Sequence, residues 1–344
     1  METLWFWTVA ATVALYLAFG GLHLGAGLAW PFVAREPGDA GMLRRTLRPF
    51  FDGSELWLVA SAVLLISAYP QFQAASQSEL FYPLAFLLAL LLLRGLAIRL
   101  HPERGASSLL WGRLFVLTSC LLVFAYGLAL GNFIRGFPLD ANGQFYLPIL
   151  HQADSDICLL RPYPIFVGVS ALILLWRHGC IWFAARCQGP ARLRARRLAL
   201  FSTWPLLGLF LALTLASFLA QPNLRHSFIE SPVGGVFPAA TVACLVISIP
   251  ALRFGHESQA FFASTTMLVS LVLSAAFASY PWILPGFEEG TGVHVSASAA
   301  AEAELGDALL FGLPGVLLLA VSLWVLLGRM RQSREGKLPS NEPR

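Results

Sequence analysis

Three ionisable residues lie in or beside apolar stretches, and each has a side chain that can transfer protons. His23 sits within the run GGLHLGAGLAWPFV at 20–33. Asp52 and Glu55 follow a loop that carries arginines and precede a second apolar run. Ionisable groups at such places in a membrane protein are usually functional, and imidazoles and carboxylates are common proton carriers. His23, Asp52 and Glu55 are therefore candidates for a proton path.

Each candidate also has a structural explanation. Asp52 followed by Glu55 is a capping-box arrangement, and both carboxylates favour the positive end of a helix dipole. We favour the cap for this pair, although a capping carboxylate can also relay protons. His23 lies beside Gly21 and Gly25, a GxxxG pair that lets another helix approach closely. Packing is our first interpretation of His23, followed by proton transfer, with heme ligation last.

The composition predicts which elements position these residues. Of 344 residues, 57% are hydrophobic and 12% are charged, whereas soluble domains contain about 25% charged residues. The apolar runs are long enough to cross about 30 Å of hydrocarbon, and they lack the alternation of membrane strands. We expect an all-α integral membrane protein with one polytopic domain at 1–330 and a disordered tail at 331–344. This class gives no basis for a nucleic-acid partner.

About nine transmembrane helices, packed as helix bundles, account for the apolar runs. When alternate loops are compared, all but three of the 23 lysines and arginines fall on one side, and the three are Arg135, Arg161 and Arg225. The positive-inside rule then puts the C-terminus in the cytoplasm and the N-terminus outside. The helices are predicted at 5–34, 54–70, 79–100, 109–131, 163–186, 198–220, 236–252, 258–280 and 306–328.

Other polar features have simpler interpretations. The first apolar run is too long for a cleavable signal peptide and is expected to remain as a helix. Arg94, flanked by apolar residues, is expected to snorkel or to pair with a carboxylate. The basic segment 189–197 should lie against anionic membrane lipid. The five cysteines form no CxxC pair, and the outer-loop sequence HQADSD at 151–156 has no recognisable metal-ligand spacing.

Five motifs occur in order along nearly the whole chain. They resemble five motifs of subunit II of the cytochrome bd quinol oxidases. In that family the motifs read DGFDxGVG, W-D/E-G-N-x-V-W-L, G-N-L-x-x-G-V-P, HG/QG-A-x-W/Y and F/YPxxxPS. No single motif is decisive, but five motifs in the same order and register are hard to produce by chance. Here they read GGLHLGAG at 20–27, FDGSELWL at 51–58, GNFIRGFP at 131–138, HGCIW at 178–182 and YPWILPG at 280–286.

The resemblance implies a multi-pass subunit of a terminal oxidase in a bacterial inner (plasma) membrane. In that family, subunit I carries two b hemes and one heme d, oxidises quinol and reduces oxygen to water. Subunit II binds no heme or metal, forms a heterodimer with subunit I and contributes to a cytoplasmic proton path. Asp52 matches the acidic residue of that path. The resemblance leaves open a small accessory single-helix subunit and a bound structural quinone.

This chain departs from the family pattern within the first two motifs. Gly20 and His23 replace two aspartates, and Ser54 and Glu55 replace two amide residues. His23 could still carry protons, and Glu55 could compensate for a lost acid. Alternatively, the path has decayed and the chain is a divergent paralogue.

Two further hypotheses use the same residues. A secondary transporter could line a substrate path with Asp52, Glu55 and His23, but the chain has no pair of broken helices in matching halves. A free-standing heme protein could use His23 and His178. That would require both imidazoles at one depth, whereas the predicted helix limits put His23 deeper.

Overall fold

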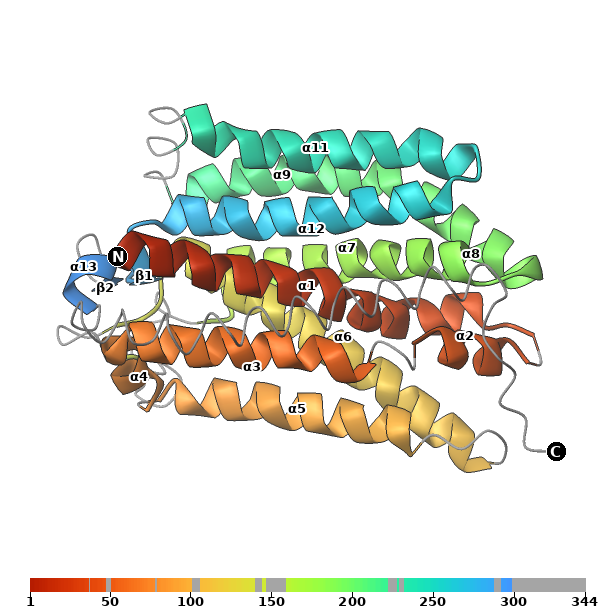
Figure 1. Cartoon of the computed structure of the whole chain (residues 1–344), viewed down its shortest axis with the longest axis horizontal. Coiled ribbons are helices and arrows are strands. Elements are labelled where there is room, and N and C mark those ends of the chain that lie inside the picture. The colour runs from red at the N-terminus through yellow and green to blue at the C-terminus, as the bar shows by residue number, and fades with distance from the viewer. Residues whose placement is uncertain are drawn as a thin grey trace.

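The computed structural model shows a bundle of long helices that run along one axis (Figure 1). It describes residues 1–36, 38–47, 51–77, 79–100, 106–139, 144–146, 159–221, 228, 232–287 and 292–298. Several side chains within these ranges, including those of 51–53, are not described. The predicted helix at 306–328 and the predicted tail lie outside the described residues.

The other predicted helices correspond to long helices of the structure. Seven stretches are long and apolar enough to cross a membrane, and α3 contains a shorter apolar helix at Ser54–Ala68. The long helices are α1 (Glu2–Val33), α3 (Phe51–Ala68), α5 (Phe81–Arg99), α6 (Ala106–Arg135), α7 (Pro162–Arg186), α9 (Thr203–Ala220), α11 (Pro232–Arg253) and α12 (Glu257–Ser279).

Some helix limits differ from the prediction. Helix α6 does not stop at Gly131 but continues to Arg135, and it ends where Gly136 adopts a φ of +107°, a backbone conformation that favours glycine. Helix α9 is preceded by α8 (Gly189–Phe201), with Ser202 between them. The basic segment that we treated as a loop is therefore helical, because Pro190 suits a first helical turn and the residues after it favour helix.

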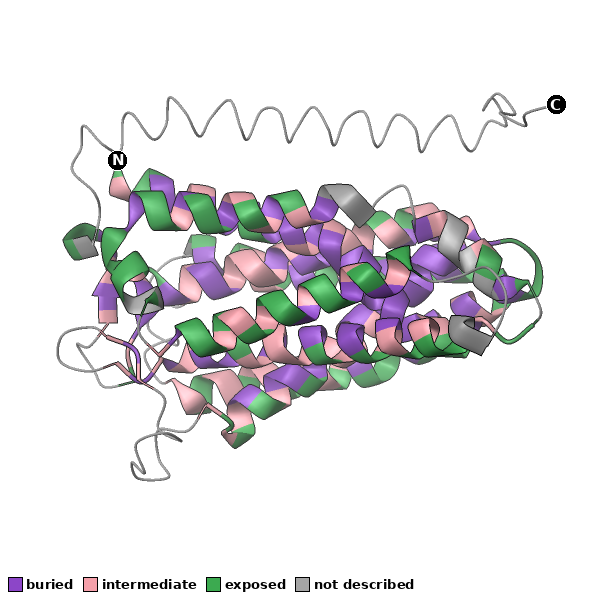
Figure 2. Cartoon of the chain, turned by 90° about the horizontal axis from the view of Figure 1, so that it is seen from below, coloured by how far each residue is buried: buried purple, intermediate pink, exposed green. Residues whose placement is uncertain are grey.

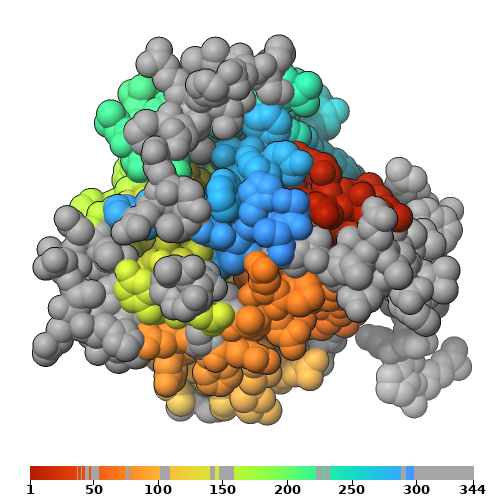
Figure 3. Space-filling model, turned by 90° about the vertical axis from the view of Figure 1, so that its left-hand side faces the viewer, coloured from red at the N-terminus to blue at the C-terminus, as the bar shows by residue number. Residues whose placement is uncertain are grey.

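Short elements cover both ends of the bundle. Helices α2 (Asp39–Leu47) and α8 lie at one end (Figure 1). At the other end, near the N-terminus, strands β1 (Trp282–Pro285) and β2 (Gly292–His294) pair in antiparallel fashion beside α4 (Pro70–Ser76) and α13 (Val295–Ser298) (Figure 3). This sheet was not predicted from the sequence, because strands of four and three residues are too short to show a two-residue alternation of apolar and polar residues.

Helix α1 lies at the centre of the packing. Buried residues concentrate toward the middle of the bundle (Figure 2). Helix α1 packs against α3, α6, α7 and α12. Gly25 of α1 lies against Gly179 of α7, and a Cβ atom at either glycine would collide with the backbone of the other helix. The predicted role of the GxxxG pair in close helix packing is confirmed, because Gly21 also contacts α7 through Leu175.

The outward faces of α5 and α9 are apolar and exposed. Leu88 and Leu92 of α5 and Leu215 and Leu219 of α9 each expose more than half of their side-chain surface. Contiguous apolar surface of this kind is unusual on a soluble monomer but is the normal surface of a protein in lipid or against a membrane partner. These faces support the membrane assignment independently of composition.

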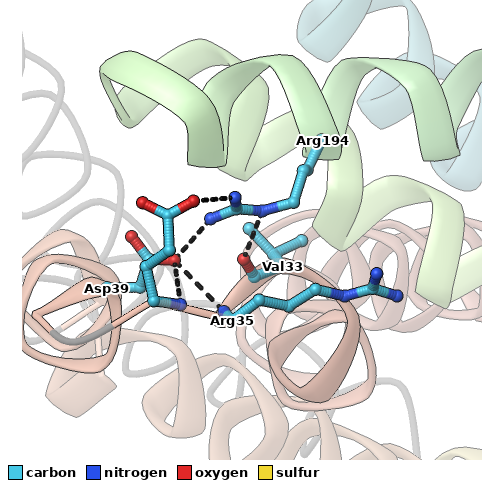
Figure 4. A network of polar contacts seen from close by, with 5 residues as sticks. Val33, Arg35, Asp39 and Arg194 are labelled. Carbon is cyan, nitrogen blue, oxygen red and sulfur yellow. Dashed lines mark hydrogen bonds and ion pairs between the residues drawn. The ribbon is translucent and has the colours of Figure 1, made fainter.

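Ion pairs join α8 to the end of α1 and to α2. Arg194 of α8 pairs with Glu36 at 2.6 Å and with Asp39, and it donates to the Val33 carbonyl at 3.2 Å (Figure 4). Asp39 Oδ2 also accepts the backbone N–H groups of Arg35 and Glu36. The Asp39 carboxylate therefore stabilises the connection between α1 and α2, because it accepts hydrogen bonds from two backbone N–H groups and from Arg194.

A second ion pair at this end joins α8 to α12. Arg192 donates to both carboxylate oxygens of the buried Glu257, the first residue of α12, at 2.9 Å. The prediction that this basic segment faces lipid is therefore incomplete. Arg192 and Arg194 are used within the chain, because acidic residues of neighbouring elements reach them, whereas Arg197 is exposed.

Candidate functional site

A buried arginine organises a polar cluster between α3, α5 and α6. Arg94 of α5 is 1% exposed, and its Nη1 lies 3.6 Å from Glu55 Oε1 of α3. Its Nε donates to Ser119 Oγ of α6 at 3.1 Å, and the guanidinium lies over the ring of Phe115. The prediction that Arg94 pairs with a carboxylate is confirmed. A buried cation needs such a partner, because removing a charge from water is costly.

Two tyrosine hydroxyls extend this cluster. Tyr16 of α1 and Tyr126 of α6 meet with their hydroxyl oxygens 3.0 Å apart, and their rings pack edge to face. The pair lies within electrostatic range of Glu55 and Arg94. Because each hydroxyl can donate and accept a hydrogen bond, such a pair can pass a proton as well as hold two helices together.

His23 lies on the face of α1 that carries these contacts. The positions Tyr16, His23 and Gly27 are separated by seven and four residues, so they fall on one stripe of a helix. Both ends of this stripe touch α6: Tyr16 at Tyr126, and Gly27 at Ser119. His23 is fully buried on this stripe. It therefore lies on the side of α1 whose other residues contact α6. We call Tyr16, His23, Glu55, Arg94, Ser119 and Tyr126 the Arg94 cluster.

Asp52 lies in the first turn of α3, close to Glu55 along the helix. Because the helix begins at Phe51, Asp52 does not occupy the N-cap position that we predicted. Its side chain is outside the described residues. Both carboxylates still lie near the positive end of the helix dipole. The Glu55 side chain is 34% exposed, so the cluster reaches the surface at the mouth of α3.

The two histidines considered as heme ligands lie on different helices. Gly25 lies against Gly179, which places His23 and His178 at about the same level, so the predicted difference in depth is wrong. However, His178 Nδ1 lies 2.9 Å from Ser264 Oγ of α12, whereas His23 lies on the stripe of α1 that contacts α6. Within the part of the chain that the structure describes, no three His, Cys, Asp or Glu side chains gather as a metal site.

A second buried polar group, which we call the Arg177 group, lies between α7, α9, α11 and α12. Arg177 donates to Thr203 Oγ1 at 3.1 Å and to Ser248 Oγ at 2.5 Å, and the neighbouring His178 contacts Ser264. Arg177 and His178 are both 0% exposed. From the sequence, this segment was recognised only as the motif at 178–182 and through His178 as a possible heme ligand. Tyr16, Ser119 and Tyr126 were not predicted as site residues, because aromatic and hydroxyl residues are ordinary in apolar helices.

Comparison with known proteins gives consistent matches. Residues 1–328 match the family model described as cytochrome bd terminal oxidase subunit II. The cytochrome bd-I ubiquinol oxidase subunit 2 of Escherichia coli (strain K12) is 22% identical over 83% of this chain and 82% of its own length. The Bacillus subtilis (strain 168) cytochrome bd ubiquinol oxidase subunit 2 is 28% identical over 58% of this chain and 57% of its own.

A further relative and a solved structure cover more of the chain. A Haemophilus influenzae protein described as a probable cytochrome oxidase subunit 2 is 22% identical, with 94% of this chain and 93% of that protein covered. A chain in the structure of bd oxidase from Geobacillus thermodenitrificans matches with a TM-score of 0.74 and 16% identity. That match covers 95% of this chain and 97% of the other. At this identity the structural match shows a shared fold.

Proposed function

The chain belongs to the cytochrome bd terminal oxidase subunit II family, and from this premise we propose that it is the second subunit of a bd-type quinol oxidase. In that role it packs against a larger heme-bearing subunit I and has no catalytic activity alone. The two b hemes, heme d and the quinol site would lie in that partner. The observation that carries this proposal is the match of the family model along nearly the whole chain.

The proposed complex lies in a bacterial inner membrane, with about nine helices of this chain crossing it as one domain. The N-terminus is outside and the C-terminus is in the cytoplasm. The distribution of arginines in space supports this orientation. Arg192, Arg194 and Arg197 of α8 lie at the end of the bundle that holds α2, and Arg135 and Arg161 lie at the ends of α6 and α7 that connect on the opposite side. The positive-inside rule assigns the first end to the cytoplasm.

Within this complex, we assign the Arg94 cluster to proton uptake from the cytoplasm. Asp52 and Glu55 would collect protons at the mouth of α3, and His23 would carry them between Glu55 and the hydroxyls of Tyr16 and Tyr126. Arg94 would act as a positioning residue that fixes Glu55. The cluster suits this role because it begins at a partly exposed carboxylate and continues through groups that both donate and accept protons.

Glu55 compensates, in this proposal, for the acids that the first family motif has lost. The second motif normally has an amide residue at the position of Glu55, yet here the carboxylate forms an ion pair with the buried Arg94. A carboxylate on α3 can thus supply the negative charge that an aspartate on α1 would otherwise provide. The path would be rerouted and not lost.

The substitution E55Q tests the path within the assembled complex. The tagged chain is isolated from native membranes in mild detergent, and assembly is judged from a larger hydrophobic partner and from b- and d-type heme bands. E55Q should keep those bands and lower quinol-driven oxygen consumption by about tenfold or more, because a carboxamide cannot transfer a proton as a carboxylate does.

The matched control is E36Q, which neutralises a more exposed carboxylate at the same end of the bundle. It should leave oxygen consumption unchanged, since partly exposed ion pairs contribute little. Heme bands with unchanged turnover in E55Q would remove Glu55 from the path while leaving the subunit assignment intact. A colourless chain without a larger partner would refute the oxidase assignment itself and favour a divergent paralogue or a transporter.

A further inference from the structure

The Arg177 group contains a buried positive charge without a matching negative charge. Among the described residues, no carboxylate lies within ion-pair distance of Arg177, and its guanidinium donates instead to the neutral hydroxyls of Thr203 and Ser248. These hydroxyls already donate to the carbonyls of Ala199 and Leu245. A guanidinium stays protonated in proteins, so the charge cannot be removed by loss of a proton.

The same group has two buried nitrogens for which the described residues provide no hydrogen-bond partner. Nη1 of Arg177 is buried and has no hydrogen-bond partner. His178 Nε2 is in the same situation. His178 Nδ1 lies 2.9 Å from Ser264 Oγ, and which of these two atoms donates depends on the imidazole tautomer. Consecutive residues of α7 thus each have a buried nitrogen without a partner among the described residues, and the N–H groups of Arg177 Nη1 are donors, which is unusual for buried polar atoms.

From the uncompensated charge and these donors, we propose that the Arg177 group binds a small monovalent anion, chloride in the cell. The anion would accept from Arg177 Nη1 and supply the missing negative charge inside the bundle. Leu206, Leu245 and Met267 form an apolar cluster between the same helices and so provide no competing polar partner. This site goes beyond the proposed function, because it is separate from the Arg94 cluster and requires no proton transfer.

Larger anions do not fit the position of Arg177. The residue is 0% exposed, so a lipid phosphate at the surface of this chain does not reach it, nor does a carboxylate of a partner subunit. Arg177 also lies nine residues before the end of α7, about 14 Å along the helix axis from that end. A single small ion satisfies the charge without requiring the several donors that sulfate or phosphate needs.

The test measures the thermal midpoint of the purified protein, with its partner subunit, prepared throughout in gluconate. Chloride or bromide then replaces gluconate at constant ionic strength. Because a ligand that binds only the folded state stabilises it, the midpoint should rise by about 2–4 °C with halide in excess. R177M should abolish the rise. The matched control R197Q, which removes an exposed arginine of α8, should retain it.

Two outcomes would overturn the proposal. One is a wild-type midpoint that does not respond to halide, which would mean that hydration alone satisfies Arg177. The other is a response that disappears in R197Q and persists in R177M, which would assign the effect to the surface. Should R177M fail to fold, anomalous scattering from wild-type crystals grown in bromide decides the question. A peak beside Arg177 supports the site, and peaks at surface arginines alone refute it.

Discussion

Among the described residues, two arginines are fully buried in the bundle, and their surroundings differ. Arg94 lies beside Glu55, a carboxylate that reaches the surface, in a cluster rich in groups that transfer protons. Arg177 lies among hydroxyls, in a group without a carboxylate or an exposed member. A buried cation can thus be matched by a group with a second function or, as we infer, by a bound ion. The Arg94 cluster is thus suited to proton transport, and the Arg177 group is suited to stable packing of the helices.

The largest effect should follow from removing the charge of Arg94. R94M leaves Glu55 without its partner, which should lower the free energy of unfolding by about 2–3 kcal/mol, less than for a fully buried pair because Glu55 is partly exposed. Proton uptake and oxygen consumption should fall as well. The double variant E55Q/R94M should recover most of the thermal midpoint but not the turnover. A double variant as unstable as R94M would contradict the ion pair as the source of stability.

A smaller effect is expected from the tyrosine hydroxyls, and it should be confined to one region. Y126F removes the hydroxyl that meets Tyr16 and should slow oxygen consumption by about three- to tenfold without changing the heme bands. Y163F removes a hydroxyl that meets Ser217 at 2.8 Å outside the Arg94 cluster, and it should leave turnover unchanged. Equal rates in the two variants would exclude the tyrosine pair from the path.

Removing Arg177 should have less effect on stability than removing Arg94. R177M leaves no protein carboxylate behind, and Thr203 and Ser248 keep their hydrogen bonds to backbone carbonyls. In halide-free buffer, the free energy of unfolding should change by about 1 kcal/mol or less. The thermal midpoints of R177M and R94M, measured together, test this order. A larger loss in R177M would mean that a protein group compensates Arg177 after all.

The smallest effect concerns Cys187, between α7 and α8. Burial, with a further contribution from the Asp39 carboxylate, raises the pKa of its thiol to about 12. Because the thiolate is the reactive form, the folded protein should not label at Cys187 with a maleimide at pH 8, and reaction should begin only as the pH approaches 12. A cysteine introduced by R197C should label readily from the cytoplasmic side. Mass spectrometry of labelled peptides measures both, and rapid labelling of Cys187 would show that this end opens.

The sequence predicted the helices well because long apolar runs in a membrane protein have few alternatives. Helix limits were less accurate where a glycine did not end the helix, as at Gly131, or where a charged segment was helical, as in α8. The end of a helix depends on the local backbone geometry, and the conformation of a charged segment depends on neighbouring carboxylates. Neither can be read from the composition.

The site was predicted only in part. The apolar flanks of Arg94 indicated a carboxylate partner but not which one, since Glu55 reaches Arg94 from another helix. The contact between Tyr16 and Tyr126 joins residues 110 positions apart and depends on how α1 packs against α6. The same holds for the relative level of His23 and His178, which the close contact of Gly25 with Gly179 determines. The roles of Asp52, Glu55 and His23 stay predictions that the substitutions above test.

The central place of α1 has a consequence for biosynthesis. This helix leaves the ribosome before the other helices described, yet 72% of its most apolar stretch is buried in the finished bundle, against 17% for α5. Its contacts with α7 and α12 cannot form until much later parts of the chain have been translated. Until then its glycine face and His23 lack their final neighbours. The early intermediate therefore needs temporary shielding from lipid, which the insertion machinery or an already folded partner subunit could provide.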